Sequence, residues 1–153
     1  MFVLVVGAGR VGSSVATAAL LAGHTVSVLD EDPLSHERLD VELGRSWEEA
    51  GGRFTIGTAL EMDALVEAGI DQADVFIAST NGDNTNLVVS QLAQRRFEVP
   101  KVIARILDPR RAAWYAEQGL QTVCPTAIAI DQLERAALGE PEAAVGRSGE
   151  TGA

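Results

Sequence analysis

The chain opens with FVLVVGAGRVG (residues 2–12), in which five apolar residues run directly into three glycines spaced as G-x-G-x-x-G. This pattern predicts a buried strand, a tight turn and the start of a helix. Gly7 permits the turn, Gly9 lets the backbone approach a pyrophosphate, and Gly12 lets the helix pack close to the strand. The free N–H groups at the start of that helix form an anion site without a basic side chain.

A second apolar run, residues 25–29, ends on Asp30, roughly 20 residues beyond the glycines. A carboxylate at this point can accept hydrogen bonds from both ribose hydroxyls, and it repels the 2′-phosphate of NADP. Strand, turn, helix, strand and acidic end together fill one βαβ unit. We therefore predict a nucleotide-binding fold. The alternative is a glycine-rich turn that binds nothing.

Apolar runs and helical patterns alternate along the rest of the chain, and six strands are expected. This order predicts an α/β fold, a Rossmann-like, doubly wound parallel sheet with the strand order 3-2-1-4-5-6. Residues 1–138 are predicted to form a single domain. Residues 139–153, rich in Gly, Glu and Ser, are expected to be a disordered tail. Residues 45–52 are expected to be an extension or a surface loop.

Composition limits the function. A chain of 153 residues suits about one domain and leaves no length for a separate substrate domain. Its 22 acidic and 12 basic residues argue against a nucleic-acid partner. The only cysteine, Cys124, is expected to be a buried thiol in a reducing cytoplasm. We expect no secretory leader and no direct membrane insertion, because no apolar segment approaches the ~20 residues that span a bilayer.

The sequence contains no evident catalytic constellation. His24 and His36 are the only histidines, and both are expected to be solvated surface groups. The pair Ser13-Ser14 has no histidine at a suitable position, and Cys124 has no His or Asp partner in its motif. We therefore predict that the protein is not an enzyme and has a binding or sensing role.

Ligands of such sheets bind where strand order reverses, at the carboxyl ends of the strands. The loop at residues 57–60 could pair with an adenine edge or be an ordinary helix start. The loop at residues 79–86 is dense in short polar side chains, most of which we expect to cap the next helix. Thr80 and Asn81 are the exceptions, because they lie at the switch point and could meet a ribose or a phosphate.

Two arginines are further candidates. Arg10 lies inside the glycine turn, where its guanidinium could reach the terminal phosphate of a nucleotide in its own subunit or a neighbour's. Arg105 ends the fifth expected strand. Its guanidinium could interact electrostatically with a phosphate or with a neighbouring subunit. Alternatively, it could form a salt bridge with Asp83 or Asp108.

The last expected helix, residues 125–138, is apolar around more than one face, with Ile128, Ile130 and Leu133 among its residues. A terminal surface helix should show a single apolar stripe. The preceding helix adds Trp114-Tyr115, an aromatic pair of the kind enriched at interfaces, although Trp114 could also pack in the core. Together these features favour a dimer.

These residues resemble the nucleotide-binding N-lobe of the RCK or KTN domains (TrkA-N type), the cytosolic regulatory subunits of Trk/Ktr potassium uptake systems. The resemblance covers residues 2 to about 137. It rests on the glycine turn with arginine at its fourth position and on Asp30. It also rests on LVEAGIDQAD at residues 65–74, which is similar to the family's L-x-x-A-G-x-x-x-A-D. Further support comes from residues 79–86, 104–109 and 119–125.

The resemblance implies binding of an adenine nucleotide, NAD(H) or AMP, ADP or ATP, and the gating of ion flux at a potassium transporter or channel subunit. Such proteins form homodimers through their last helices, and then rings beneath a membrane pore, at the inner face of the cell membrane. By this resemblance Gly7, Gly9, Arg10 and Val11 would hold phosphates, Asp30 the ribose, Thr58 and Ala59 the adenine, and Thr80 and Asn81 would lie beside the phosphates. The complete predicted set adds Ala8, Gly12, Glu31 and Arg105.

The chain departs from the family in two ways. Thr58 stands where many relatives carry aspartate, so a role that needs a charge there is not expected. The chain also ends where relatives continue into a C-terminal lobe, so it is either a piece of a longer protein or a short subunit that pairs with a fuller-length RCK subunit. The alternative functions are a small NAD-dependent oxidoreductase fragment and a free-standing NAD(H) redox sensor. The sequence shows neither a substrate pocket nor an output module for them.

Overall fold

A computed structural model describes residues 1–140, and the predicted tail beyond Glu140 lies outside the described residues. The expected sheet is confirmed: six parallel strands have the order β3-β2-β1-β4-β5-β6. The strands are β1 (Phe2–Val6), β2 (Thr25–Asp30), β3 (Arg53–Ile56), β4 (Val75–Ala78), β5 (Lys101–Arg105) and β6 (Gln121–Val123). The first strand lies in the middle, between β2 and β4.

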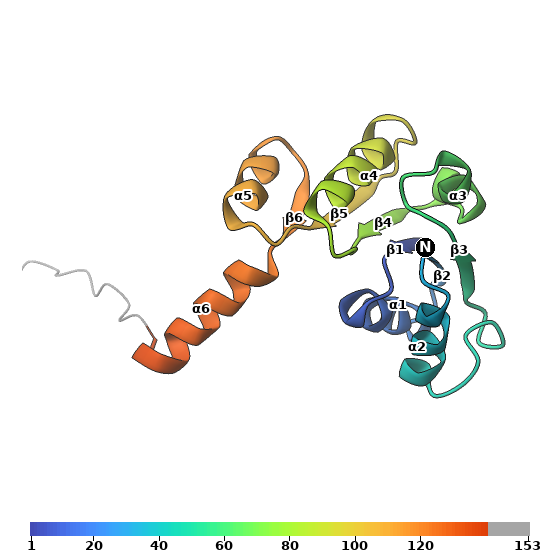
Figure 1. The fold of residues 1–153 in the computed structure, drawn as a ribbon, viewed down its shortest axis with the longest axis horizontal. Coiled ribbons are helices and arrows are strands. Elements are labelled where there is room, and N and C mark those ends of the chain that lie inside the picture. The colour runs from blue at the N-terminus through green and yellow to red at the C-terminus, as the bar shows by residue number, and fades with distance from the viewer. Residues whose placement is uncertain (141–153) are drawn as a thin grey trace, which may run out of the picture.

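Helices cover both faces of the sheet (Figure 1). Their bounds are α1 (Arg10–Leu21), α2 (Leu34–Leu43), α3 (Met62–Glu67), the short 3-10 helix η1 (Ile70–Gln72), α4 (Asp83–Arg95), α5 (Pro109–Glu117) and α6 (Pro125–Leu138). The α1 and α2 helices lie on one face, and α3 and α4 lie on the other. Each crossover between parallel strands is thus made by a helix that packs back on the sheet.

The central strands are apolar on both sides because each face has its own core. In β1, Leu4 and Val6 belong to one buried cluster, whereas Val3 and Val5 belong to the other. Neighbouring residues of a strand point to opposite faces, so a continuous apolar run suits a strand covered by helices on both sides. This burial explains why FVLVV shows no alternation of apolar and polar residues.

The loop between α2 and β3 differs from the surface loop expected at residues 45–52. Trp47 is fully buried in the cluster that α1 and α2 cover, and its indole N–H donates to the Arg53 carbonyl at 3.0 Å. Its backbone N–H donates to Asp40 Oδ1 at 2.8 Å. Glycines on either side of an aromatic residue suggested an exposed loop, but the indole supplies enough apolar surface to fix this segment against the domain.

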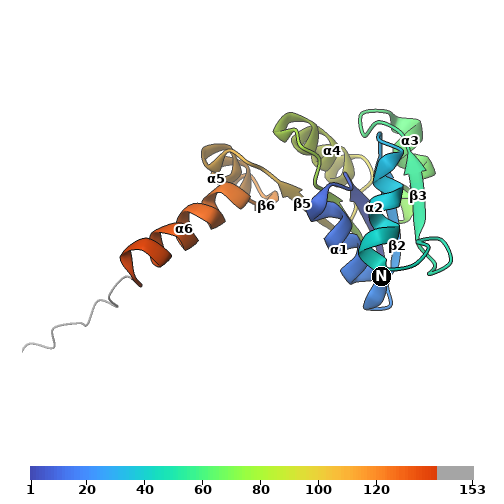
Figure 2. The same cartoon turned by 60° about the horizontal axis from the view of Figure 1, so that its bottom comes forward.

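The last helix, α6, leaves the domain and runs away from the sheet (Figures 1 and 2). None of its residues is buried, and Ile128, Ile130, Leu133 and Leu138 are 50%, 47%, 68% and 85% exposed. Cys124, which precedes α6, was expected to be a buried thiol, but its side chain is only partly buried. Its Sγ accepts a hydrogen bond from the Ala127 N–H at 3.4 Å and so caps the helix. Within residues 1–140, no helix is long and apolar enough to cross a lipid bilayer.

Candidate functional site: a pocket at the switch point of the sheet

A cavity of about 490 Å³ lies at the carboxyl ends of β1 to β4. Its volume is within the range of small-molecule sites. The chain leaves β1 and β4, which are neighbours, toward opposite sides of the sheet, and the crevice between them is the expected position of a ligand. Its walls come from the ends of β1 and β2, from the loops that follow the four strands, and from α2 and α4. The lining residues are Val6, Gly7, Gly9, Leu29, Asp30, Glu31, Asp32, Ser35, Arg38, Gly57, Thr58, Ala59, Leu60, Ser79, Thr80, Asn81, Gly82 and Thr85.

Each of the three glycines meets a different constraint. Gly7 has φ +95°, and a Cβ there would lie 2.7 Å from the Ser79 carbonyl carbon. A Cβ on Gly12 would lie 1.8 Å from the Gly7 carbonyl oxygen, so α1 packs directly on the turn. Gly9 is different, because a Cβ there would meet no atom within 4 Å. Only Gly9 combines a pocket-lining position with open space beside it, which keeps the backbone accessible to a ligand.

Asp30 binds the glycine turn as well as lining the cavity. Its Oδ2 accepts a hydrogen bond from the Ala8 N–H at 2.6 Å, and its Oδ1 accepts one from the Asp32 N–H at 2.8 Å. A carboxylate has about four acceptor positions, so both oxygens can still accept from a ligand. The two backbone donors fix the orientation of the carboxylate at the end of β2.

Arg38 is a pocket residue that the sequence reasoning missed. It projects from α2, lines the cavity, and donates through Nη1 to the Ala8 carbonyl at 2.6 Å. Its charge offsets part of the negative charge of Asp30, Glu31 and Asp32. No sequence motif marks Arg38, because its position depends on how α2 docks beside the glycine turn.

The loop after β4 is held by Asn86, whose side chain is buried. Its Oδ1 accepts from the Thr80 N–H at 3.0 Å and from the Thr80 hydroxyl at 2.6 Å. Its Nδ2 donates to the Thr80 carbonyl at 3.0 Å and to the Arg105 carbonyl at 2.8 Å. The expected capping role is therefore wrong for this loop: α4 has no side-chain cap, and Asn86 instead joins the loop to the end of β5.

Asp83 makes a second link between the loops. Its carboxylate accepts from the backbone N–H groups of Leu107 and Asp108 at 2.8 Å and 3.1 Å. The described residues contain no ion pair between Arg105 and either Asp83 or Asp108, which was one of the two expected alternatives. The Nε of Arg105 is buried and has no hydrogen-bond partner within residues 1–140.

The structure brings most of the predicted cofactor-binding residues to the cavity. Those that line it are Gly7, Gly9, Asp30, Glu31, Thr58, Ala59, Thr80 and Asn81. Ala8 is buried behind the turn and Gly12 lies beneath it. Arg10 and Val11 are exposed on the first turn of α1, and Arg105 lies at the end of β5; these three do not line the cavity.

The fold and the site define a Rossmann-like domain with a cavity at its switch point. The TrkA-N domain model matches residues 3–126, and the chain belongs to this family. It is 43% identical over 135 residues to the Trk system potassium uptake protein TrkA of Streptomyces coelicolor, a match that covers 88% of this chain and 57% of that protein. It is 34% identical over 137 residues to the protein of the same name in Mycobacterium tuberculosis, a match that covers 86% of this chain and 59% of that protein. The chain thus spans less than two thirds of these curated relatives.

Solved structures show the same fold. The Kef CTD of Shewanella denitrificans in its AMP-bound form has a TM-score of 0.72 at 24% identity, covering 90% of this chain and 80% of that one. The TrkA-N domain of the inner membrane protein ybaL from Escherichia coli has a TM-score of 0.70 at 24% identity, covering 87% and 94%. GsuK bound to ADP has a TM-score of 0.70 at 19% identity, and the match covers 88% of this chain and 33% of that one.

Proposed function

We propose that this chain is the nucleotide-binding regulatory unit of a potassium uptake system and gates ion flux when an adenine nucleotide or NAD(H) binds. The observation that carries the proposal is the cavity at the switch point, with the glycine turn on one side and Asp30 on the other. Relatives named as Trk system potassium uptake proteins support the assignment to a potassium uptake system. Solved structures of the same fold with AMP and ADP support an adenine nucleotide.

The contacts of the pocket suggest how the nucleotide lies. Phosphates would meet the open backbone at Gly9 and the first N–H groups of α1, where the helix dipole favours an anion. The ribose would donate to the free lone pairs of Asp30. The adenine would lie at Thr58 and Ala59, in the loop after β3. Asp30 and Glu31 disfavour a 2′-phosphate, so NADP(H) is expected to bind weakly.

The pocket supports binding better than catalysis. The ionisable side chains on its walls are Asp30, Glu31, Asp32 and Arg38, and no imidazole or thiol lines it within the described residues. A nicotinamide oxidoreductase needs a group that exchanges a proton with the substrate, and a second surface that holds that substrate. We therefore propose a protein that is not an enzyme and converts ligand binding into a change of conformation.

Gating requires that the nucleotide bind one conformation of an assembly more tightly than another. The exposed apolar residues of α6 are proposed to form the interface of a homodimer, from which a larger ring or a complex with a fuller-length RCK subunit could grow. The assembly would lie in the cytoplasm against a transporter or channel subunit at the inner face of the membrane. The domain is proposed to span residues 1–138.

The proposal is tested by titrating the purified protein with AMP, ADP, ATP, NAD⁺, NADH and NADPH while following its thermal unfolding, and by calorimetry for each ligand that raises the melting temperature. A ligand at 100 times its Kd should stabilise the fold by about 2.7 kcal/mol. NADPH should give the smallest shift. The absence of a shift with every nucleotide would refute the proposal.

Asp30→Asn provides the residue-level test. It keeps the size of the side chain and an acceptor oxygen but removes the charge, so affinity for every ribose-containing ligand should fall about tenfold or more. Asp63→Asn, an exposed acid on α3 outside the pocket, is the matched control and should leave affinity unchanged. Equal affinities of the Asp30→Asn variant and the wild type would remove Asp30 from the ribose site.

A further inference from the structure

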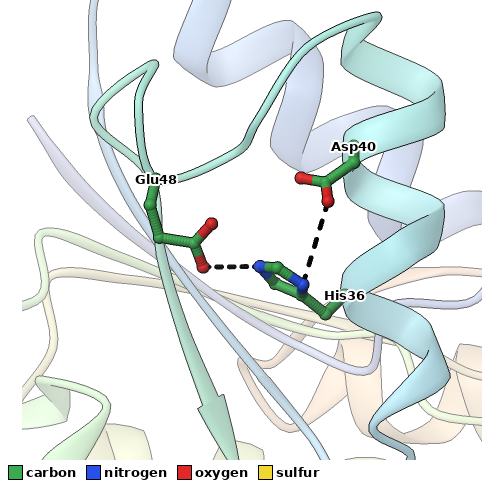
Figure 3. Close-up of side chains that lie close together, drawn as sticks. All are labelled: His36, Asp40 and Glu48. Carbon is green, nitrogen blue, oxygen red and sulfur yellow. Dashed lines mark hydrogen bonds and ion pairs between the residues drawn. The ribbon is translucent and has the colours of Figure 1, made fainter.

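A cluster of side chains with potential metal-ligand atoms lies outside the nucleotide pocket. His36 and Asp40 are one turn apart on α2, and Glu48 lies in the loop that follows (Figure 3). The His36 Nε2 is 2.5 Å from Glu48 Oε1, and its Nδ1 is 3.9 Å from Asp40 Oδ2. His36 was expected to be a solvated group, but two carboxylates hold its ring from opposite sides, and the side chain is only 32% exposed.

The short contact to Glu48 determines which nitrogen of the neutral ring carries the proton. A carboxylate only accepts hydrogen bonds, so Nε2 is the donor and Nδ1 keeps its lone pair. That lone pair faces Asp40 Oδ2, which is also an acceptor, and 3.9 Å is too long for a hydrogen bond. Tetrahedral metal bonds of about 2.0–2.2 Å place two ligand atoms roughly 3.3–3.6 Å apart. A shift of a few tenths of an ångström in either side chain would therefore let Nδ1 and Oδ2 bind one cation.

Packing around the group restrains it before any ion binds. Asp40 uses its other oxygen, Oδ1, to accept the Trp47 N–H at 2.8 Å, and Trp47 is fully buried. The ring of His36 lies against Phe54 with a centroid separation of 5.2 Å. Within residues 1–140, Asp40 and Glu48 form no ion pair with lysine or arginine, and the His36 ring is the group that both carboxylates contact.

We propose that His36 Nδ1 and Asp40 Oδ2 bind a divalent first-row transition ion of the Zn²⁺ class, with water completing the coordination. Glu48 is the positioning residue that fixes the ring through Nε2, as carboxylates do beside metal-bound histidines. One candidate ligand atom from each of the three residues lies within 4.8 Å of the others. An imidazole ligand favours Zn²⁺, Co²⁺ or Ni²⁺ over Mg²⁺ and Ca²⁺, which prefer oxygen.

Such an ion would fasten the loop that contains Trp47 to α2. The same helix carries Ser35 and Arg38 to the nucleotide pocket, so the metal site and the pocket would share one structural element. The site stands independently of the nucleotide proposal, because none of its three residues lines that pocket.

The test uses the complete, untagged chain, which contains only two histidines, His24 and His36. Zn²⁺ is titrated while the imidazole C–H and ¹⁵N resonances are followed by NMR, and affinity is measured by calorimetry. One Zn²⁺ should bind per chain, and the His36 resonances should shift while those of His24 stay in place. Mg²⁺ and Ca²⁺ should not produce these shifts. A response confined to His24, or equal shifts with Mg²⁺, would overturn the proposal.

Variants assign the roles within the group. His36→Asn and Asp40→Asn should each lower Zn²⁺ affinity about tenfold or more, and Asp40→Asn keeps an oxygen for the Trp47 N–H. The matched controls are His24→Asn for the other imidazole and Glu37→Gln for a charge on the same helix. Both should leave affinity unchanged. A loss with His24→Asn equal to that with His36→Asn would contradict the assignment.

The role of Glu48 is tested with two substitutions. Glu48→Gln keeps an acceptor for the Nε2–H, whereas Glu48→Ala removes it. Glu48→Ala should lower Zn²⁺ affinity about 10- to 100-fold and shift the ¹⁵N signature of the metal-free ring from a single tautomer protonated at Nε2 toward the tautomer-averaged values of a free imidazole. Glu48→Gln should retain that signature and part of the affinity. An unchanged ¹⁵N signature in Glu48→Ala would show that Glu48 does not position the ring.

Discussion

Substitution of Gly12 by alanine should destabilise the domain because α1 rests directly on the glycine turn. The new Cβ would lie 1.8 Å from the Gly7 carbonyl oxygen and 2.8 Å from Ser79 Oγ, and real Cβ atoms essentially never come closer than 3.0 Å to another atom. The Gly7 contact is with backbone, so α1 must move by more than an ångström. Overpacking of this kind costs about 3 kcal/mol or more, and the better helix propensity of alanine returns about 1 kcal/mol.

The net loss of about 2 kcal/mol should appear in urea unfolding followed by far-UV circular dichroism, with a melting temperature lower by roughly 5–10 °C. Gly9→Ala is the matched control. Its φ of −68° suits alanine, and the new Cβ meets no atom. The poorer helix cap and the reduced entropy of the unfolded chain nearly cancel, so stability should stay within about 0.5 kcal/mol.

Gly9→Ala should instead weaken nucleotide binding about tenfold, because its methyl group would occupy space beside the proposed phosphate position. The two variants therefore separate a glycine needed for packing from one needed for the ligand. If Gly12→Ala unfolds at the same urea concentration as the wild type, the close contact between α1 and the turn is not rigid, and the steric reasoning fails.

Three further substitutions test other contacts. Arg38→Met keeps the stem but removes the guanidinium from the pocket, so calorimetry should show a loss of nucleotide affinity of about tenfold; unchanged affinity would exclude Arg38 from the site. Trp47→Phe leaves the Arg53 carbonyl without its buried donor, and urea unfolding should show a loss of about 1–3 kcal/mol, whereas a loss within error would mean that water replaces the indole. Leu133→Asp should convert the proposed dimer to a monomer in light scattering, while Gln132→Asp on the same helix should not; a mass unaffected by Leu133→Asp would contradict a dimer through α6.

The sequence predicted the sheet order and the edge that carries the pocket because both follow from local patterns. The turn at Gly7–Gly12 and the acid at Asp30 mark two neighbouring strand ends, and the alternation of strands and helices sets the sheet order. Since all strands are parallel, their carboxyl ends meet at one edge, and loops far apart in the chain become neighbours there. Thr80 could be assigned to the switch point on that basis, whereas the assignment of Thr58 to the adenine came from the family resemblance.

Residues whose position depends on tertiary packing could not be predicted in the same way. Arg38 reaches the pocket only because α2 docks with that side of the helix toward Ala8. Asn86 lies in a helix start that favours capping, yet its amide bonds to two strand-end loops that are adjacent only in the folded sheet. Trp47 lies between polar and glycine residues, and only its burial shows that the loop belongs to the core.

The position of Asp30 shows why loss of affinity and loss of structure must be measured separately at this pocket. Its carboxylate accepts hydrogen bonds from the Ala8 and Asp32 N–H groups, so alanine at this position would remove the proposed ribose acceptor and also leave two backbone donors without partners. A displaced glycine turn would then weaken ligand binding even if Asp30 did not contact the ribose. Asparagine retains one acceptor oxygen, which can keep the shorter bond to the Ala8 N–H while the negative charge is lost. If Asp30→Asn unfolds near the wild-type urea concentration but binds nucleotide about tenfold more weakly, the loss comes from the charge and the second acceptor oxygen of the carboxylate and not from a displaced glycine turn.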